Sequence, residues 1–256
     1  MPQVSSVCGG AFGYGRGLQG ALPNGGCGSY KMPGIGTVCS IALPYSSNMR
    51  FDTADYTFEY FVFFPVGTVS QLPPSTSGVL TTVNGRAAPL GLSFSNSGTG
   101  LTIFWNGLRW DSAGPTGQTA ITLDTSTLVD QWSHWAFVQQ SGVGQSLYVN
   151  GNRCKLLANV FTADPSETTP ATYTFNIGYR NTPMFFSNIR LVKGYALYTG
   201  TTYTVPTSPL TAIPGTAYLL NATTRGPVKD TSPNNQRVIN TSAANPVRWD
   251  PKTPFS

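Results

Sequence analysis

The feature that most constrains this chain is a regular succession of short strand-like runs separated by turn-forming residues. FEYFVFF (58–64), TYTFNIGYR (172–180) and FFSNIRLVKG (185–194) are rich in aromatic and β-branched residues, a composition typical of β-strands. The first run carries one charge and is predicted to be a buried central strand. No segment shows a helical period, so the pattern favours an all-β sandwich or barrel.

Asn-Gly pairs mark the expected hairpins. Asn106-Gly107 lies between two strand-like runs in LTIFWNGLRWDS, and Asn150-Gly151 does the same in SLYVNGNRCKLL. Asn-Gly favours the type I′ turn, whose positive φ angles suit a two-residue hairpin loop. The segment VNGRAAPLGLSF (83–94) is a third, looser hairpin candidate.

Composition excludes several classes of function. The 256 residues suit one large all-β domain or two small ones. Charged residues make up 10%, and the 15 basic residues are scattered, although the net charge is +5. Nucleic-acid binding is not expected, because it needs clustered basic residues. No apolar run is long enough for a membrane span.

Residues 1–39 differ from the rest, with 11 of the 28 glycines and only Arg16 and Lys31 as charges. Such a segment cannot build its own core, so either its own domain or a neighbouring subunit has to hold it. We expect an N-terminal assembly arm at 1–39 and a sandwich at 40–256, with virion proteins or further copies of the chain as partners of the arm. The N-terminus also lacks the pattern of a signal peptide, although the composition looks extracellular. Release by cell lysis, as part of a virus particle, reconciles these two observations.

The four cysteines do not indicate a metal site. Cys8, Cys27, Cys39 and Cys154 include no pair with CxxC spacing, which makes zinc binding unexpected. The first three share the glycine-rich segment and could form a disulfide there. Buried free thiols are the alternative.

The only histidine lies in the run WSHWAFVQQ. Trp132, His134, Ala136 and Val138 alternate with Ser133, Trp135, Phe137 and Gln139 along a predicted strand. Both faces are largely apolar, as expected for a strand between packed layers. We therefore interpret His134 as a packed or hydrogen-bonded side chain of a sheet rather than a catalytic group.

Four motifs resemble a known family. W-S-H-W-A-F-V followed by a turn and S-L-Y-V-N-G resembles the laminin-G/pentraxin-like branch of the concanavalin A-like lectins and glucanases. FFSNIRLVKGYALYTGTTYTVPTSPLTAI is similar to the closing hairpin of that family, in a form common in structural proteins of tailed bacteriophages. SIALPYSSNMRFDTADYTFEYFVFF resembles the opening of these phage modules. AYLLNATTRGPVKDTSPNNQRVINTSAANPVRWDPKTPF resembles their end.

The resemblance covers about residues 40–255 and implies a jelly-roll sandwich of two antiparallel sheets. It also implies that the first and last strands meet, with 40–64 near 238–249. It implies a non-enzymatic virion protein, as a capsid decoration or a tail or fibre component at the particle surface, whose lectin-like domain adheres to host glycans. The alternatives are a free carbohydrate-binding module or adhesin and, third, a glycoside hydrolase.

Catalysis and metal binding are not expected. A glycosidase needs two carboxylates flanking the bond, but Glu59 and Glu167 are the only glutamates and the chain has no run such as E-x-D-x-E. We predict no cofactor. Calcium is the alternative, because it occurs in branches of the family, but the loop acids show no D-x-D or D-x-N run. These loop acids are Asp111, Asp124, Asp130 and Asp164.

Sugar binding needs an exposed aromatic ring and a polar side chain that holds hydroxyl groups. The best local candidates are Trp105 with Asn106, and Trp110 with Asp111, on either side of the predicted hairpin tip. The alternative is that both tryptophans are ordinary core residues of the sandwich.

Overall fold

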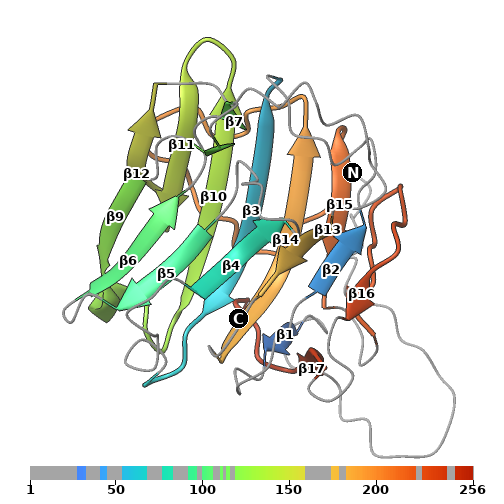
Figure 1. Ribbon diagram of the computed structural model, residues 1–256. Helices are drawn as coiled ribbons and strands as arrows, with labels where there is room; N and C mark the ends of the chain where they lie inside the picture. Colours follow the sequence, from blue (N-terminus) through green and yellow to red (C-terminus); the bar gives the residue numbers. More distant parts are fainter. Residues whose placement is uncertain are drawn as a thin grey trace, which may run out of the picture.

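The structure is a computed structural model of the chain. It describes residues 28–32, 41–44, 54–67, 77–82, 92–96, 100–105, 110–111, 114–115, 119–158, 174–178, 183–222, 227–240 and 246–255. Two antiparallel sheets lie face to face, as Figure 1 shows, and no α-helix occurs among these residues. The predicted all-β sandwich is therefore confirmed. In this part of the chain no helix combines the length and the apolar character of a membrane span.

The eight-stranded sheet has the order β12-β11-β10-β3-β14-β1-β17, and β15 also pairs with β14. Its central strand β3 is the aromatic run in which burial was expected, and all its residues are buried. The bounds are β1 Ser29–Met32, β3 Tyr56–Phe63, β10 Trp132–Gln140, β11 Gly144–Val149, β12 Asn152–Leu157, β14 Met184–Lys193, β15 Thr216–Leu220 and β17 Arg248–Asp250.

The seven-stranded sheet has the order β16-β2-β13-β4-β5-β6-β9. Its first two strands pair Ile239 and Asn240 with Ala42 and Ile41, so the early and late parts of the sandwich meet as expected. A separate pair, β7 with β8, completes the strands. The bounds are β2 Ile41–Pro44, β4 Ser77–Thr82, β5 Leu92–Asn96, β6 Gly100–Trp105, β7 Trp110–Asp111, β8 Gly114–Pro115, β9 Thr119–Asp124, β13 Thr174–Ile177 and β16 Ile239–Asn240, with a 3-10 turn η3 at Thr125–Thr127.

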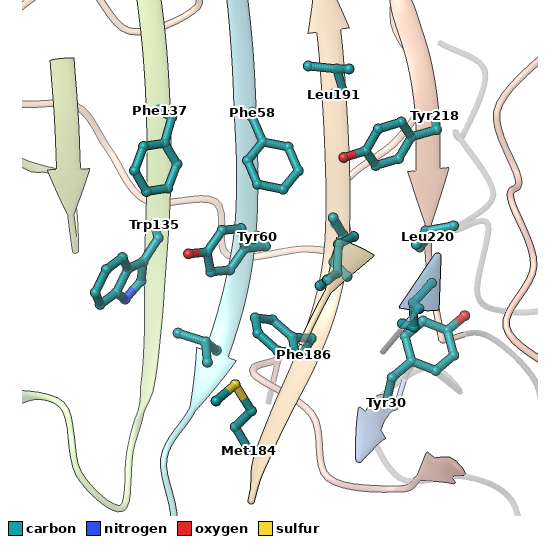
Figure 2. Close-up of a cluster of buried hydrophobic side chains, with 14 of the residues drawn as sticks. Tyr30, Phe58, Tyr60, Trp135, Phe137, Met184, Phe186, Leu191, Tyr218 and Leu220 are labelled. Carbon is teal, nitrogen blue, oxygen red and sulfur yellow. The ribbon is translucent and has the colours of Figure 1, made fainter. Parts of the chain in front are cut away.

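An aromatic core lies between the two sheets. Figure 2 shows that its side chains stand in rows on one face of β10, β3, β14 and β15. Trp135 and Phe137 belong to this core, whereas Ala136 and Val138 belong to a separate cluster on the other face of β10. The predicted alternation along this strand is therefore confirmed. Aromatic pairs such as Tyr60 with Trp135, 6.3 Å between ring centroids, add packing energy beyond the area that they bury.

Part of the predicted arm lies within the sandwich. β1 pairs with β14 on one side and with β17 on the other. Tyr30 is 2% exposed, and its hydroxyl donates a hydrogen bond to the Asn221 carbonyl over 3.0 Å. The chain's own domain thus holds residues 29–32. Residues 1–27 and 33–39 lie outside the described residues, and so do Cys8, Cys27 and Cys39, so the division at residue 39 stays a prediction.

The hairpin predictions had different outcomes. β11 and β12 pair across Asn150 and Gly151, whose φ angles of 47° and 78° fit the predicted type I′ turn. The hairpin predicted at Asn106-Gly107 is wrong, because β6 pairs with β5 and β9 while β7 pairs with β8. Strand pairing between sequence-distant partners overrode the local turn signal there. β4 and β5 do pair, and the loop between them lies outside the described residues.

Candidate functional site

The strongest polar constellation lies on the outer face of the eight-stranded sheet, beneath residues 194–213, which we call the crossing segment. This segment runs from the end of β14 towards β15 and covers the sheet face opposite the core. Ala196, Tyr198 and Tyr203 pack against Ala136, Val138 and Tyr148. Five side chains beneath or within this segment form the buried polar cluster: Glu59, His134, Arg190, Tyr198 and Tyr203.

A bulge in β14 brings Arg190 into this cluster. Ser187 pairs with Phe61 and Arg190 with Glu59, so β14 has one residue more than β3 between these two pairs. Asn188 lies in this bulge with φ 51°, in the left-handed region that asparagine tolerates better than most residues. Phe186 and Ile189 both belong to the core cluster, which shows that the bulge shifts the alternation by one residue. Without it, Arg190 would point into the apolar core.

Asn188 is fixed by its own side chain. Its Nδ2 donates to Ser187 Oγ over 2.8 Å, and its Oδ1 accepts from the Leu210 backbone amide over 3.0 Å. Asn221 Nδ2 donates to the Leu210 carbonyl over 2.9 Å. Two buried asparagines therefore hold the far end of the crossing segment on the sheet.

Glu59 is the centre of the cluster and is 0% exposed. Its Oε1 accepts from Nε and Nη2 of Arg190 over 2.8 and 2.5 Å, and its Oε2 accepts from the Tyr198 hydroxyl over 2.7 Å. Nη1 of Arg190 donates to the Thr211 carbonyl over 2.7 Å. Burial alone would raise the pKa of Glu59, but the His134 ring, the charge of Arg190 and the Tyr198 hydroxyl hold that pKa below its ordinary value of 4.5. Glu59 is thus a buried carboxylate.

His134 contacts the same carboxylate. Its Nε2 lies 3.2 Å from Oε2 of Glu59, although the two are not aligned as a hydrogen bond, and its Nδ1 lies 2.5 Å from the Tyr203 hydroxyl. A neutral ring that accepts from Tyr203 at Nδ1 carries its hydrogen on Nε2, towards Glu59. His134 is 1% exposed, so the prediction of a packed, hydrogen-bonded sheet histidine is confirmed.

The tyrosines of the crossing segment act as donors and as packing surfaces. Burial, with the nearby charge of Glu59, raises the pKa of both Tyr198 and Tyr203, so their hydroxyls stay protonated. The two rings stack at 3.7 Å between centroids and 13° between planes. The Tyr148 hydroxyl, from β11, donates to the Gly200 carbonyl over 2.7 Å. Tyrosine rings and hydroxyls together fasten the segment to β10 and β11.

The β11–β12 turn supports the segment from the side. The Tyr203 amide donates to the Gly151 carbonyl over 2.8 Å, and Asn150 Oδ1 accepts from the His134 amide over 2.9 Å. A Cβ added at Gly151 would lie 2.4 Å from the Tyr203 carbonyl oxygen. Glycine is therefore required here for its positive φ and for this close approach. The motif S-L-Y-V-N-G thus builds both a hairpin and a seat for the crossing segment.

The cluster holds an acid, a base and hydroxyls close together, but its acid and base are only 0% and 1% exposed. Glu59 and His134 are buried beneath the segment, and every partner named above belongs to the fold. A buried carboxylate that is paired with a guanidinium and a hydroxyl is held in one position, and so are the elements that carry its partners. The arrangement therefore positions the crossing segment.

The predicted sugar-binding residues lie around one excursion of the chain between β6 and β9. Trp105 is the last residue of β6 and pairs with Thr119, the first residue of β9, so this pair closes the excursion. Trp110 and Asp111 form β7 and pair with Pro115 and Gly114. Asn106 and the side chains of Trp105, Trp110 and Asp111 lie outside what the structure describes. The backbone thus brings three of the four positions into one excursion, and their role stays a prediction.

Of the acids considered for calcium, the Asp124 carboxylate has a structural partner and Asp130 is held through its backbone. Oδ1 of Asp124 accepts from the Ser126 amide over 2.8 Å at the start of η3, and this bond lowers the pKa of Asp124. The Asp130 amide donates to the Phe64 carbonyl over 2.8 Å. Asp164 and the Asp111 side chain lie outside the described residues. Within the described ranges, no three His, Cys, Asp or Glu residues gather as a metal site would require.

Comparison with known proteins places this fold in a family. The family described as the concanavalin A-like lectin/glucanases superfamily matches residues 40–195. The chain belongs to this superfamily. The superfamily match includes β2 to β14, so β1, β15 and β17 complete the eight-stranded sheet from outside it. No curated protein matches the sequence.

Several solved structures are similar to this chain at low sequence identity. A candidate carbohydrate-binding protein from Bacteroides ovatus has a TM-score of 0.52 and 12% identity, covering 90% of this chain and 62% of that protein. A heptameric SAP-like pentraxin from Limulus polyphemus has a TM-score of 0.41 and 15% identity, and the match covers 65% of this chain and 76% of the pentraxin. The receptor binding domain of botulinum neurotoxin C/D mosaic serotype has a TM-score of 0.46 and 11% identity. The match covers 67% of this chain and 40% of that chain. This chain thus spans less than two thirds of the Bacteroides protein.

Sequence reasoning missed the pairing of Glu59 with Arg190. The available signal was the single acid in a strand of buried aromatic residues, which requires a partner. Arg190 could not be identified from alternation, because the bulge at Asn188 moves it to the other face.

Proposed function

We propose that this chain is a non-enzymatic, lectin-like module that binds glycan, and that it serves as a structural protein of a tailed-bacteriophage particle. The superfamily contains both lectins and glucanases, so the chain's own residues have to distinguish sugar binding from glycoside hydrolysis. The observation that carries the proposal is the burial of the only histidine and of Glu59 beneath the crossing segment. The groups best suited to acid-base catalysis are used to build the scaffold.

Further carboxylates have structural roles. Asp230 is 1% exposed and accepts from the amides of Leu219, Ser232 and Gln236 over 2.9, 2.9 and 2.7 Å. Asp250 Oδ1 accepts from the Lys252 amide over 2.9 Å. A glycosidase instead needs two carboxyl groups on either side of a bound sugar. These contacts favour a binding module over a hydrolase.

The sugar-binding surface that we propose is the β6–β9 excursion with Trp105, Asn106, Trp110 and Asp111. Tryptophan presents a large apolar face to the C–H groups of a sugar, while amide and carboxylate groups bond its hydroxyls. The relation to the candidate carbohydrate-binding protein of Bacteroides ovatus supports the ligand class, through the fold.

The proposal is tested on an array of bacterial surface polysaccharides and neutral and acidic oligosaccharides, with the purified full chain. We expect saturable binding to at least one glycan and its loss in Trp110→Ala, with Val66→Ala as a control at a residue 75% exposed elsewhere. An array without any signal would contradict glycan binding. Turnover of a polysaccharide that disappears when one carboxylate is changed would instead establish a glycoside hydrolase.

The proposed phage role rests on the sequence runs that resemble modules of tailed-bacteriophage structural proteins. In the run DTSPNN (230–235), which belongs to the phage-like end of the chain, Asp230 accepts from the Ser232 hydroxyl over 2.8 Å and Asn234 Nδ2 donates to the Ala217 carbonyl over 2.8 Å. The motif therefore fixes this part of the chain against β15. Mass spectrometry of purified particles should find this chain in stoichiometric amounts. Particles without it would refute the virion assignment and leave glycan binding unaffected.

The pairing of β1 within its own sheet favours a second candidate, a free carbohydrate-binding module or adhesin. The test is removal of residues 1–27, which spares β1. The free module predicts unchanged glycan binding and no effect on assembly, whereas the virion protein predicts loss of particle incorporation.

A further inference from the structure

Tyr195 differs from the other tyrosines of the crossing segment. It is 49% exposed, whereas Tyr198 and Tyr203 pack on the sheet. The large apolar side chains that stand exposed in the described part of the chain are Val66, Val143, Leu156 and Tyr195, so Tyr195 is the one aromatic residue among them. An exposed tyrosine ring offers a ligand an apolar face together with a hydroxyl group.

The surrounding backbone holds this ring in place. The Tyr195 carbonyl accepts from Thr57 Oγ1 over 3.0 Å, and the preceding amide of Gly194 donates to the Asp55 carbonyl over 2.7 Å. A Cβ added at Gly215 would lie 2.9 and 3.0 Å from Cδ2 and Cε2 of Tyr195, so one edge of the ring lies close to the Gly215 backbone. A ring held in this way loses little freedom when a ligand binds.

Glycines leave open space at two turns at this end of the sheet. A Cβ added at Gly194 or at Gly142, in the β10–β11 turn, would meet nothing within 4 Å. Both have positive φ, 81° and 75°, so larger residues are disfavoured at these two turns. A flat ring next to open turns leaves room for a ring-shaped ligand.

A carboxylate lies at the same end of the sandwich. Asp55 directly precedes β3, and its Oδ1 accepts from the Ser141 amide over 2.6 Å. In the described residues its Oδ2 accepts no hydrogen bond, and the side chain is partly exposed. The Gly194 amide bonds the Asp55 carbonyl, so the backbones of Asp55 and Tyr195 come close together, while the Asp55 carboxylate is turned towards the β10–β11 turn.

From this arrangement we propose a second sugar-binding site at the end of β3 and β14, in which Tyr195 stacks on a neutral pyranose and Asp55 accepts hydrogen bonds from its hydroxyls or from those of the next sugar. The inference rests on the proposed glycan-binding function and adds a contact surface separate in sequence from the β6–β9 excursion. A carboxylate beside the ring favours a neutral sugar over an acidic one.

The test uses the neutral oligosaccharide with the strongest signal on the glycan array, titrated calorimetrically into the full chain. Tyr195→Ala should weaken binding about tenfold or more, as expected for loss of an aromatic anchor. Tyr195→Phe keeps the stacking face and should stay within about twofold, while Asp55→Asn should weaken binding about threefold or more. Val66→Ala is the exposed apolar control, and equal urea midpoints confirm that each variant is folded.

The outcomes separate this inference from the proposed function. If Trp110→Ala abolishes binding while Tyr195→Ala leaves it unchanged, the Tyr195 site is refuted and glycan binding stands. If the wild type binds acidic glycans only, the neutral-sugar site is likewise refuted. If the wild type binds no glycan at all, both proposals fail together.

Discussion

The guanidinium of Arg190 donates hydrogen bonds from Nε and Nη2 to a single carboxylate oxygen, Oε1 of Glu59, over 2.8 and 2.5 Å. The side chains of both residues are buried, at 8% and 0% exposed. Removing one partner of such a pair leaves an uncompensated charge in a medium of low polarity, which costs more than the pair contributes when complete. The pair is therefore a point at which single substitutions have large effects.

Arg190→Met should lower the free energy of unfolding by about 3–5 kcal/mol, because Glu59 keeps its charge without the guanidinium. Urea unfolding followed by tryptophan fluorescence measures the change. The double variant Glu59→Leu/Arg190→Met removes both charges and should be more stable than Arg190→Met alone. Equal stability of the single and the double variant would show that the carboxylate is not the source of the cost.

The lowered pKa of Glu59 predicts an acid-sensitive contribution to stability. A group whose pKa in the folded state lies below its unfolded value binds fewer protons when folded, so it stabilises the fold above the unfolded value. That contribution is complete above about pH 5, since the ordinary value is 4.5, and is lost as the pH falls through the folded pKa. The gap in unfolding free energy between wild type and Glu59→Gln should therefore narrow as the pH falls below about 5. A gap that stays constant in urea titrations across this range would contradict the assignment.

The bulge predicts an unusual order of substitutions at Asn188. Alanine and glycine both lose the bonds to Ser187 and Leu210, but only alanine is strained at φ 51°. Asn188→Gly should thus be more stable than Asn188→Ala by about 1 kcal/mol, the reverse of the order at an ordinary strand position. Thermal unfolding of the two variants checks the order. Alanine as the more stable variant would argue against the bulge.

How far the sequence predicts this structure depends on whether a signal is local. β3, β13, β14 and the β11–β12 hairpin follow from composition and from Asn150-Gly151, because each signal lies within the element that it forms. The partner of β6 could not be predicted in this way, since β9 pairs with it only after residues 106–118. The same holds for the candidate site. His134 was correctly placed in a sheet, but its partners Glu59 and Tyr203 come from distant segments.

The position of the crossing segment depends on tyrosine hydroxyl groups as well as on tyrosine rings. Tyr198→Phe keeps the stacking on Tyr203 but removes the bond to Oε2 of Glu59, and leaving that oxygen short of a donor should cost about 1–3 kcal/mol. Because the segment is fastened at this point, the variant should also be cut faster within residues 194–213 in limited proteolysis. Tyr195→Phe, at an exposed position whose hydroxyl takes no part in the cluster, is the matched control and should be cut at the wild-type rate. If both variants are cut equally fast, the Tyr198 hydroxyl does not hold the segment, and ring packing alone accounts for its position.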